Sequence, residues 1–283
     1  MSAHDLLDSY ALGRTDAETW RLIQQGHIYA PYTRQFLVEA GITAGMKVLD
    51  VGSGAGDVAL LLADLVGPQG KVVGTDTNAA ILEVARARSQ AAGWTNMTFL
   101  AGDAQQLSLD ADYDAVVGRW VLMYTPDPIA VLRRLSGALR PGGVVAFQEI
   151  DFTYAPMAYP QTPLFESVSQ SAIPHVGDRP PGAPDPQMGL RLYQTYLDAG
   201  LPTPRLRLDM PIGGGADWPG YSYLVGTLRS LLPFLQRTGM ASPEALQTWG
   251  DLDTLPDRLR DEALSARSLQ VLPALIGAWA RKP

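Results

Sequence analysis

The sequence predicts an α/β fold in which helices cover both faces of a doubly wound, mostly parallel sheet. Between Ile42 and Ile150, short apolar strands alternate with amphipathic helices, and this alternation is typical of a parallel sheet. The first strand, Lys47 to Val51, runs directly into a glycine-rich turn that is followed by a helical pattern. Ligands of such folds bind at the carboxyl ends of the strands, so we expect the functional site at that edge.

The segment before the first strand, residues 1–41, is expected to be helical. Thr15 and Glu18 have the spacing of a capping box, which predicts a helix running to about Tyr29. Pro31 favours the start of a second helix, because proline suits the first helical position.

One face of the first expected helix carries Trp20, Gln24 and His27, which are spaced so that they lie side by side. An aromatic ring with two polar groups is an unusual mixture for a core, and it favours a lid over a bound cofactor. The alternative is that Trp20 packs on the domain and His27 is solvated.

Helix-capping residues mark the repeating units of the core, residues 42–151. Asn78 is a good cap for a helix reaching Ala92, and Asp127 precedes a proline at the first position of the helix after the fourth strand. The proline-rich segment 152–186 then interrupts the pattern around one expected helix, Leu164 to Ile173. A long insertion on the ligand side of a sheet is more often a binding loop than a linker, so we expect it to shape the acceptor pocket.

The C-terminal part, residues 187–283, returns to the core pattern and contains a helical insertion at 214–265. Residues 188–199 form an amphipathic helical pattern, and Arg205 to Ile212 alternate as a strand does. The final apolar stretch, Leu275 to Arg281, is interpreted as the last strand.

Composition limits the class of protein. The 283 residues suit one large domain or a core with a smaller cap, and the net charge of -7 argues against a nucleic-acid substrate. The chain has no cysteine, which excludes disulfides and thiolate metal sites. No apolar run approaches the roughly 20 residues needed to span a bilayer, and the first residues do not resemble a signal peptide. We therefore expect a soluble, cytoplasmic protein that acts on a small molecule and does not bind membranes.

The glycine-rich turn and a following acid indicate a nucleoside site. Glycines allow the tight turn and the close approach of the backbone to a ligand, and Asp76 ends the next strand, where it can accept hydrogen bonds from both ribose hydroxyls. Asp57 at the start of the helix would repel a pyrophosphate, which disfavours a nicotinamide dinucleotide and favours an adenosine without phosphates. The glycines are Gly52, Gly54 and Gly56.

Five segments in order resemble the class I S-adenosylmethionine-dependent methyltransferases. They are Val48–Asp57, Asp76, Phe99–Ala104, Tyr113–Arg119 and Leu139–Gly143. The resemblance implies a Rossmann-like sheet of seven strands that ends in an antiparallel hairpin. It also implies S-adenosyl-L-methionine as cofactor and S-adenosyl-L-homocysteine as product.

The resemblance also implies the cofactor-binding residues. Asp50 would hold the ammonium group, Asp76 with Thr77 the ribose, and Asp103 with the Ala104 N–H the adenine. The Arg119 carbonyl would face the ammonium group, and Tyr10 or Arg34 would serve the carboxylate. The three glycines would pass close to the methionine and ribose portions.

Catalytic residues are predicted on chemical grounds. Methyl transfer from a sulfonium is an in-line displacement that needs alignment and exclusion of water, and some acceptors also need a base. The candidates are His27, Tyr32, Glu149 and His175. For each histidine, an exposed or structural role is the alternative.

The function predicted from these observations is methylation of a small, aromatic or natural-product-like acceptor. The alternative is a methyltransferase fold that binds the cofactor without transferring methyl, as a cyclase or a regulator. The acceptor, the methylated atom (carbon, nitrogen or oxygen), the base and the choice between monomer and homodimer stay open.

Overall fold

The computed structural model describes residues 16–154, 157–172 and 184–283, and the chain divides into two compact units. The first, which we call the sheet unit, comprises Tyr29–Asp151, Gln187–Asp209 and Leu275–Pro283. The second, which we call the insertion unit, comprises Met1–Ile28, Phe152–Pro186 and Met210–Ala274. His175 and Tyr10 lie outside the described residues.

The sheet unit is built on a seven-stranded sheet with the order β3-β2-β1-β4-β5-β10-β7. Strands β1 to β5 pair in parallel, and β10 pairs with β7 in the antiparallel direction. The strands are β1 (Lys47–Val51), β2 (Lys71–Asp76), β3 (Met97–Ala101), β4 (Tyr113–Arg119), β5 (Leu139–Asp151), β7 (Arg205–Asp209) and β10 (Ala274–Arg281). The predicted fold class is therefore confirmed, including the antiparallel hairpin at the end of the chain.

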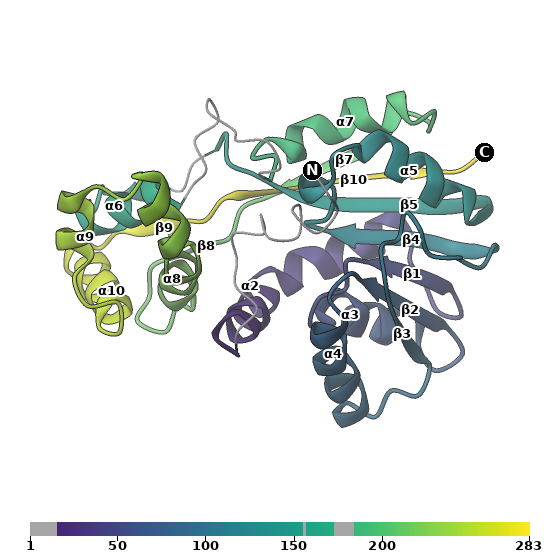
Figure 1. Cartoon of the computed structure of the whole chain (residues 1–283), viewed down its shortest axis with the longest axis horizontal. Coiled ribbons are helices and arrows are strands. Elements are labelled where there is room, and N and C mark those ends of the chain that lie inside the picture. The colour runs from purple at the N-terminus through teal and green to yellow at the C-terminus, as the bar shows by residue number, and fades with distance from the viewer. Residues whose placement is uncertain (1–15, 155–156, 173–183) are drawn as a thin grey trace. The chain divides into compact units, whose positions relative to one another are not determined.

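Helices cover both faces of this sheet (Figure 1). Helices α2, α3 and α4 bury apolar side chains such as Phe36, Leu62 and Leu82 against one face. Helices α5 and α7 lie on the other face, where α7 packs on β5. The helices are α2 (Asp16–Ala40), α3 (Asp57–Val66), α4 (Ala79–Ala91), α5 (Pro128–Gly137), α7 (Met188–Asp198) and the short 3₁₀ helix η1 (Leu122–Tyr124).

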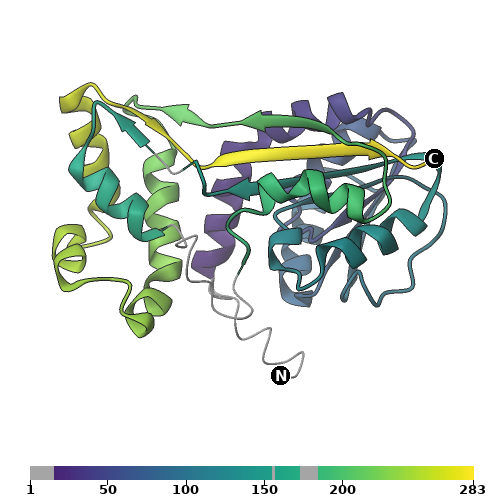
Figure 2. The same cartoon turned by 90° about the horizontal axis from the view of Figure 1, so that it is seen from above.

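The strand order reverses between β1 and β4, and this reversal positions the site. Strands β2 and β3 lie on one side of β1, whereas β4, β5 and β10 lie on the other. The loops that leave the carboxyl ends of β1 and β4 therefore diverge, which is where doubly wound sheets bind their ligands. Figure 2 shows β10, in yellow, running between β5 and β7.

Two predicted caps are confirmed, and one predicted helix break is wrong. The Asn78 side chain accepts from the N–H groups of Ala80 and Ile81, and Asp127 accepts from Ala130. The break at Pro31 is absent, because α2 is one helix of 25 residues with Pro31 inside it. Proline removes one hydrogen bond of the helix ladder, and its ring crowds the carbonyl four residues before it. Burial of Phe36 and Leu37 on the sheet stabilises the part of the helix that follows and outweighs this cost.

The insertion unit combines a small sheet with helices, and the small sheet was not predicted. It has the order β6-β9-β8, with antiparallel pairing between strands of two or three residues. The elements are β6 (Met157–Tyr159), α6 (Pro163–Ala172), β8 (Ile212–Gly213), α8 (Gly220–Thr238), α9 (Pro243–Trp249), α10 (Leu255–Ala266) and β9 (Leu269–Val271). Helix α6 agrees with the predicted helix, Leu164 to Ile173, to within one residue at each end, and α8, α9 and α10 belong to the predicted helical insertion.

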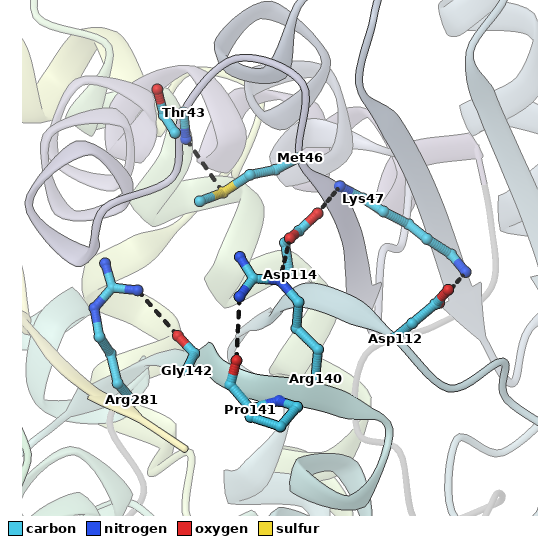
Figure 3. Close-up of polar contacts among 9 residues, drawn as sticks. All are labelled: Thr43, Met46, Lys47, Asp112, Asp114, Arg140, Pro141, Gly142 and Arg281. Atoms are coloured by element: carbon cyan, nitrogen blue, oxygen red, sulfur yellow. Dashed lines mark hydrogen bonds and ion pairs between the residues drawn. The ribbon is translucent and has the colours of Figure 1, made fainter. Parts of the chain in front are cut away.

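A polar cluster closes the amino edge of the large sheet (Figure 3). Asp114 on β4 accepts from the Lys47 N–H at 2.7 Å and from Arg140 Nε at 2.6 Å. Burial raises the pKa of Asp114, but these two hydrogen bonds outweigh it and hold the pKa below the ordinary value. Lys47 Nζ also pairs with Asp112 at 2.6 Å. The cluster ties β1, β4 and β5 together at the edge opposite the candidate site.

Within the described residues, no helix is long and apolar enough to cross a bilayer. The same part of the chain contains no group of three or more histidine, aspartate or glutamate side chains arranged to hold a metal ion.

Candidate functional site

The loop that leaves β1 has a backbone that only glycine adopts without strain. Gly52, Gly54 and Gly56 have φ values of 67°, 52° and 87°, all in the left-handed region. A Cβ at Gly52 would also lie 2.6 Å from the Val121 side chain. The Ser53 N–H donates to the Thr75 carbonyl at 2.9 Å, which ties the turn to the neighbouring strand β2. The shape of the turn is therefore held by its three glycines and by its hydrogen bond to β2.

Asp76 at the end of β2 holds this loop from the side. Its Oδ2 accepts from the Gly54 N–H at 2.9 Å and its Oδ1 from the Asn78 N–H at 2.8 Å. Burial raises the pKa of Asp76, and the two backbone hydrogen bonds oppose that rise. A carboxylate offers about four acceptor sites, so each oxygen retains capacity for one further donor, such as a sugar hydroxyl.

Asp50 lies beneath the loop and is only 1% exposed. The Ser53 hydroxyl donates to Asp50 Oδ2 at 2.8 Å. Burial raises the pKa of Asp50 to about 7, with the Ser53 hydrogen bond and the positive charge of Arg119 acting in the opposite direction. A carboxyl group in this state becomes fully ionised when a cation arrives, which suits a group that binds ammonium.

Arg88 of α4 closes the other end of the loop. Its guanidinium donates to the Ala55 carbonyl at 2.6 Å and to Asp57 Oδ1 at 2.8 Å. Asp57 is thus paired at the start of α3, and its charge repels a phosphate less than the sequence argument assumed. Because Arg88 pairs with Asp57, this carboxylate alone does not exclude a dinucleotide.

The expected adenine segment forms a tight turn after β3. Asp103 Oδ1 accepts from the Gln105 N–H at 2.8 Å, and the Ala104 carbonyl accepts from Arg134 Nε at 3.2 Å. Ala104 is buried, whereas Thr77, expected to assist Asp76, is exposed. The structure thus brings the carboxyl ends of β1, β2 and β3 to one edge of the sheet, and Asp50, Asp76 and Asp103 lie along that edge.

Arg119 ends β4, and its side chain lies against α2. The guanidinium donates to Thr33 Oγ1 at 3.1 Å and lies 5.4 Å from the centre of the Trp120 ring. Arg34, expected to serve a carboxylate, instead pairs with Asp64 of α3 at 2.5 Å on the surface.

Glu149 has a clear architectural role. It is fully buried on β5, and its carboxylate accepts from the N–H groups of Val121 at 3.0 Å, Leu122 at 2.8 Å and Met123 at 3.3 Å. It therefore caps η1 and holds the loop after β4, whatever further role it has in catalysis.

Two of the four catalytic candidates, Tyr32 and Glu149, belong to the sheet unit. His27 is exposed on the part of α2 that belongs to the insertion unit, and His175 is outside the described residues. Tyr32 belongs to the sheet unit, where burial and, to a smaller extent, the charge of Asp209 raise its pKa. A raised pKa keeps the phenol protonated, which makes Tyr32 a better hydrogen-bond donor than base at neutral pH.

Sequence reasoning missed three residues that shape this edge. Ser53 lies inside the glycine motif, and its position before Gly54 was a usable signal. Arg88 and Gln148 gave no local signal, because one lies in an ordinary helix and the other within an apolar strand.

Comparison with known proteins gives a family for the central part of the chain. Residues 42–176 match the family model described as "Methyltransferase domain". The chain is 34% identical over 138 residues to demethylmenaquinone methyltransferase of Lactococcus lactis, covering 48% of this chain and 54% of that protein. It is 32% identical over 161 residues to arsenite methyltransferase of Aquipseudomonas alcaligenes, covering 53% and 46%. The chain thus spans only part of the length of the curated relatives it matches.

Solved structures share the fold at low sequence identity. The YcgJ protein of Bacillus subtilis superposes with a TM-score of 0.56 at 16% identity, covering 89% of this chain and 98% of that one. The BH2331 protein of Bacillus halodurans superposes with a TM-score of 0.55 at 20% identity, covering 89% and 98%. These two structures confirm the fold. The family match over residues 42–176 agrees with the resemblance and the cofactor predicted from the five sequence segments.

Proposed function

We propose that this chain, of which residues 42–176 form a methyltransferase domain of the class I S-adenosylmethionine-dependent type, transfers a methyl group to a small-molecule acceptor. One observation carries the proposal. Three glycines with left-handed backbones stand at alternate positions after β1, and the middle one, Gly54, donates its N–H to Asp76, the acid that ends β2. This arrangement places a carboxylate with remaining acceptor capacity beside a glycine-rich backbone turn, which suits the hydroxyls of a nucleoside.

The residues at this edge fit S-adenosylmethionine. Asp76 has acceptor capacity for the ribose hydroxyls, and Asp50 supplies a buried carboxyl for the ammonium group. The Asp103 and Ala104 turn would recognise the adenine. The glycines present no side chain that would occupy the space above the loop; a Cβ at Gly54, for example, would contact nothing within 4 Å.

The cofactor supplies an activated methyl group on a sulfonium, so the protein need not generate a strong electrophile. What the chain contributes is position. The fixed loop, Asp76 and Asp50 hold the donor in one orientation, and Glu149 fixes the loop after β4 against which an acceptor would align. Alignment and exclusion of water are the main demands of an in-line displacement.

A flat, oxygen-bearing organic acceptor fits this chain better than arsenite. Two of the relatives named above methylate demethylmenaquinone and arsenite by their names, and a third, from Hahella chejuensis, is a C-methyltransferase of ubiquinone and menaquinone biosynthesis (32% identity over 152 residues, covering 53% of this chain and 60% of that protein). Arsenite is a soft, thiol-seeking ion, and the chain has no cysteine to bind it. We therefore propose an aromatic or natural-product-like acceptor.

The test is calorimetric titration of the protein with S-adenosylhomocysteine, followed by a transfer assay. Asp76→Ala is expected to raise the dissociation constant about 10- to 100-fold, because two hydrogen bonds to a charged acceptor are lost. Glu83→Ala removes an exposed carboxylate from α4 and is the matched control. An unchanged affinity in Asp76→Ala would contradict the proposed cofactor site.

The transfer assay measures S-adenosylhomocysteine production with a panel of phenols, hydroquinones, aryl amines and arsenite. Product from an aromatic acceptor supports the proposal. Tight cofactor binding with no product from any acceptor would instead support a fold that uses the cofactor without transferring methyl.

A further inference from the structure

An unusual group of buried polar atoms lies where β4 and β5 end. Among the described residues of the sheet unit, Trp120 Nε1 and both amide atoms of Gln148 are buried without a hydrogen-bond partner. The two residues are neighbours, because the Trp120 N–H donates to the Gln148 carbonyl at 2.8 Å. Gln148 is only 1% exposed. Buried polar groups in native proteins are nearly always paired, so such a concentration calls for an explanation.

A cation accompanies these atoms. Arg119 is the register partner of Gln148 across the β4–β5 pair, and its guanidinium lies 5.4 Å from the Trp120 ring centre. Arginine, a tryptophan N–H and an amide NH₂ group are all hydrogen-bond donors. The set is therefore rich in donors and suits a ligand oxygen that carries negative charge.

Helix α2 covers the same point with one of its faces. Tyr29, Thr33 and Phe36 are spaced so that they lie along one side of the helix. The Tyr29 ring meets the Trp120 ring edge to face with centres 4.9 Å apart, and Thr33 accepts from Arg119 at 3.1 Å. All of these residues belong to the sheet unit. A ligand here would be enclosed by aromatic rings as well as by donors.

The backbone at Trp120 points to the same place. Its φ of 58° is in the left-handed region, which residues other than glycine rarely adopt. Such conformations persist where the surroundings enforce them, and they cluster at ligand sites. Glu149 helps to hold Trp120 in this conformation, because its carboxylate accepts from the N–H groups of the two residues that follow Trp120.

We propose that Trp120, Gln148 and Arg119 form a seat for an anionic oxygen of the methyl acceptor, such as a phenolate, enolate or carboxylate oxygen. The inference rests on the proposed function and deepens it, since it assigns the acceptor a negative oxygen on a flat body. Gln148 and Trp120 are then specificity-determining residues, and their two donors, the Gln148 NH₂ group and the Trp120 indole N–H, gain a partner when the acceptor binds.

The first experiment uses calorimetry on the protein loaded with S-adenosylhomocysteine, with benzoate as probe and benzamide as its uncharged isostere. Benzoate is expected to bind at least about tenfold more tightly than benzamide. Gln148→Leu and Trp120→Phe are each expected to weaken benzoate binding about tenfold, the loss typical of one hydrogen bond to a charged group. Gln270→Leu is the matched control, because Gln270 is an equally buried, unpartnered glutamine in the insertion unit. Equal binding of the two probes, or unchanged binding in both seat variants, would overturn the proposal.

A second experiment separates this seat from a purely structural glutamine. If Gln148 lacks partners in the ligand-free protein, Gln148→Leu raises the melting temperature, by about 2–4 °C for a typical gain. A glutamine satisfied by internal water would give a lower melting temperature in the same variant, and that result would count against the seat. In ¹⁵N spectra, the indole N–H signal that disappears in Trp120→Phe is expected to move when benzoate is added to the wild type.

Two further arms keep the possible failures apart. If Gln148→Leu weakens S-adenosylhomocysteine but not methylthioadenosine, which lacks the amino-acid part, the seat binds the cofactor's carboxylate and the acceptor assignment is wrong. Probe binding is measured without turnover. A protein that transfers methyl to no acceptor therefore refutes the proposed function without deciding the fate of the seat.

Discussion

Asp50 should make cofactor binding depend on pH. Its carboxyl group is buried, and its pKa of about 7 means that the free protein holds a proton there at mildly acidic pH. The cofactor's ammonium group favours the ionised carboxylate, so binding must release that proton below pH 7. The groups that act on Asp50 are Ser53 and Arg119, which favour ionisation, and Asp76 and Asp57, which oppose it.

The magnitude follows from the pKa. At pH 5, two units below the pKa of about 7, about 1% of the free protein carries an ionised Asp50. If the bound state requires the carboxylate, affinity rises about tenfold per pH unit from pH 5 to pH 7 and then levels off. The expected gain is about 50-fold from pH 5 to pH 7, where half of Asp50 is ionised, and about 100-fold on the plateau near pH 8. In Asp50→Asn the affinity is lower throughout and the slope disappears.

The assay is titration calorimetry with S-adenosylhomocysteine at half-unit steps from pH 5 to pH 8, in two buffers with different ionisation enthalpies. Near pH 6, the buffer dependence of the enthalpy should report release of about one proton in the wild type and none in Asp50→Asn. Asp114→Asn, which removes a carboxylate at the opposite edge of the sheet, is the matched control. Affinity that does not change with pH in the wild type, or a slope that survives in Asp50→Asn, would refute the reasoning.

Three further predictions concern the framework of the site. Gly54→Ala should lower the free energy of unfolding by about 1–2 kcal/mol, measured by urea denaturation, because an L-residue at φ 52° is strained; a neutral result would mean that the loop relaxes. Arg88→Met should lower the free energy of unfolding by about 1–3 kcal/mol in the same assay, since Asp57 and the Ala55 carbonyl both lose a partner. It should also weaken S-adenosylhomocysteine binding, and an unchanged affinity would show that the loop keeps its shape without Arg88. Asp114 has a pKa below its ordinary 3.8, so its contribution to stability is present above that pH and is lost as the pH falls through the lower, folded-state value. Acid unfolding curves of Asp114→Asn should lack this loss, and curves that parallel the wild type would disprove it.

Much of the cofactor edge could be predicted because its signals are local. Positions with left-handed dihedrals favour glycine, so the turn is visible in the sequence. Asn78 and Asp127 mark helix starts because each side chain accepts from N–H groups two or three residues further along the chain. Asp76 could be placed because the end of a strand is visible in the sequence. For each of these residues, the neighbouring sequence is enough to explain its structural role.

The parts that escaped prediction depend on partners far away in the chain. Strands β6, β8 and β9 are only two or three residues long. They begin at Met157, Ile212 and Leu269, so more than 50 residues separate each strand from the next. Gln148 was absorbed into an apolar strand pattern, and only the fold shows that it pairs in register with Arg119. Pro31 predicted a helix end, but burial of the residues after it overrides the local preference.

The two attachments of helix α4 to the glycine turn have a wider consequence. Asp76, just before this helix, grips Gly54, and Arg88, near its far end, grips Ala55. The glycine-rich turn is thereby held at two points, which leaves its backbone little freedom to adapt to a different nucleoside. Variants selected for new acceptors should therefore carry their substitutions at the ends of β4 and β5. Trp120 and Gln148 can be replaced there without loss of the hydrogen bonds that hold the glycine-rich turn.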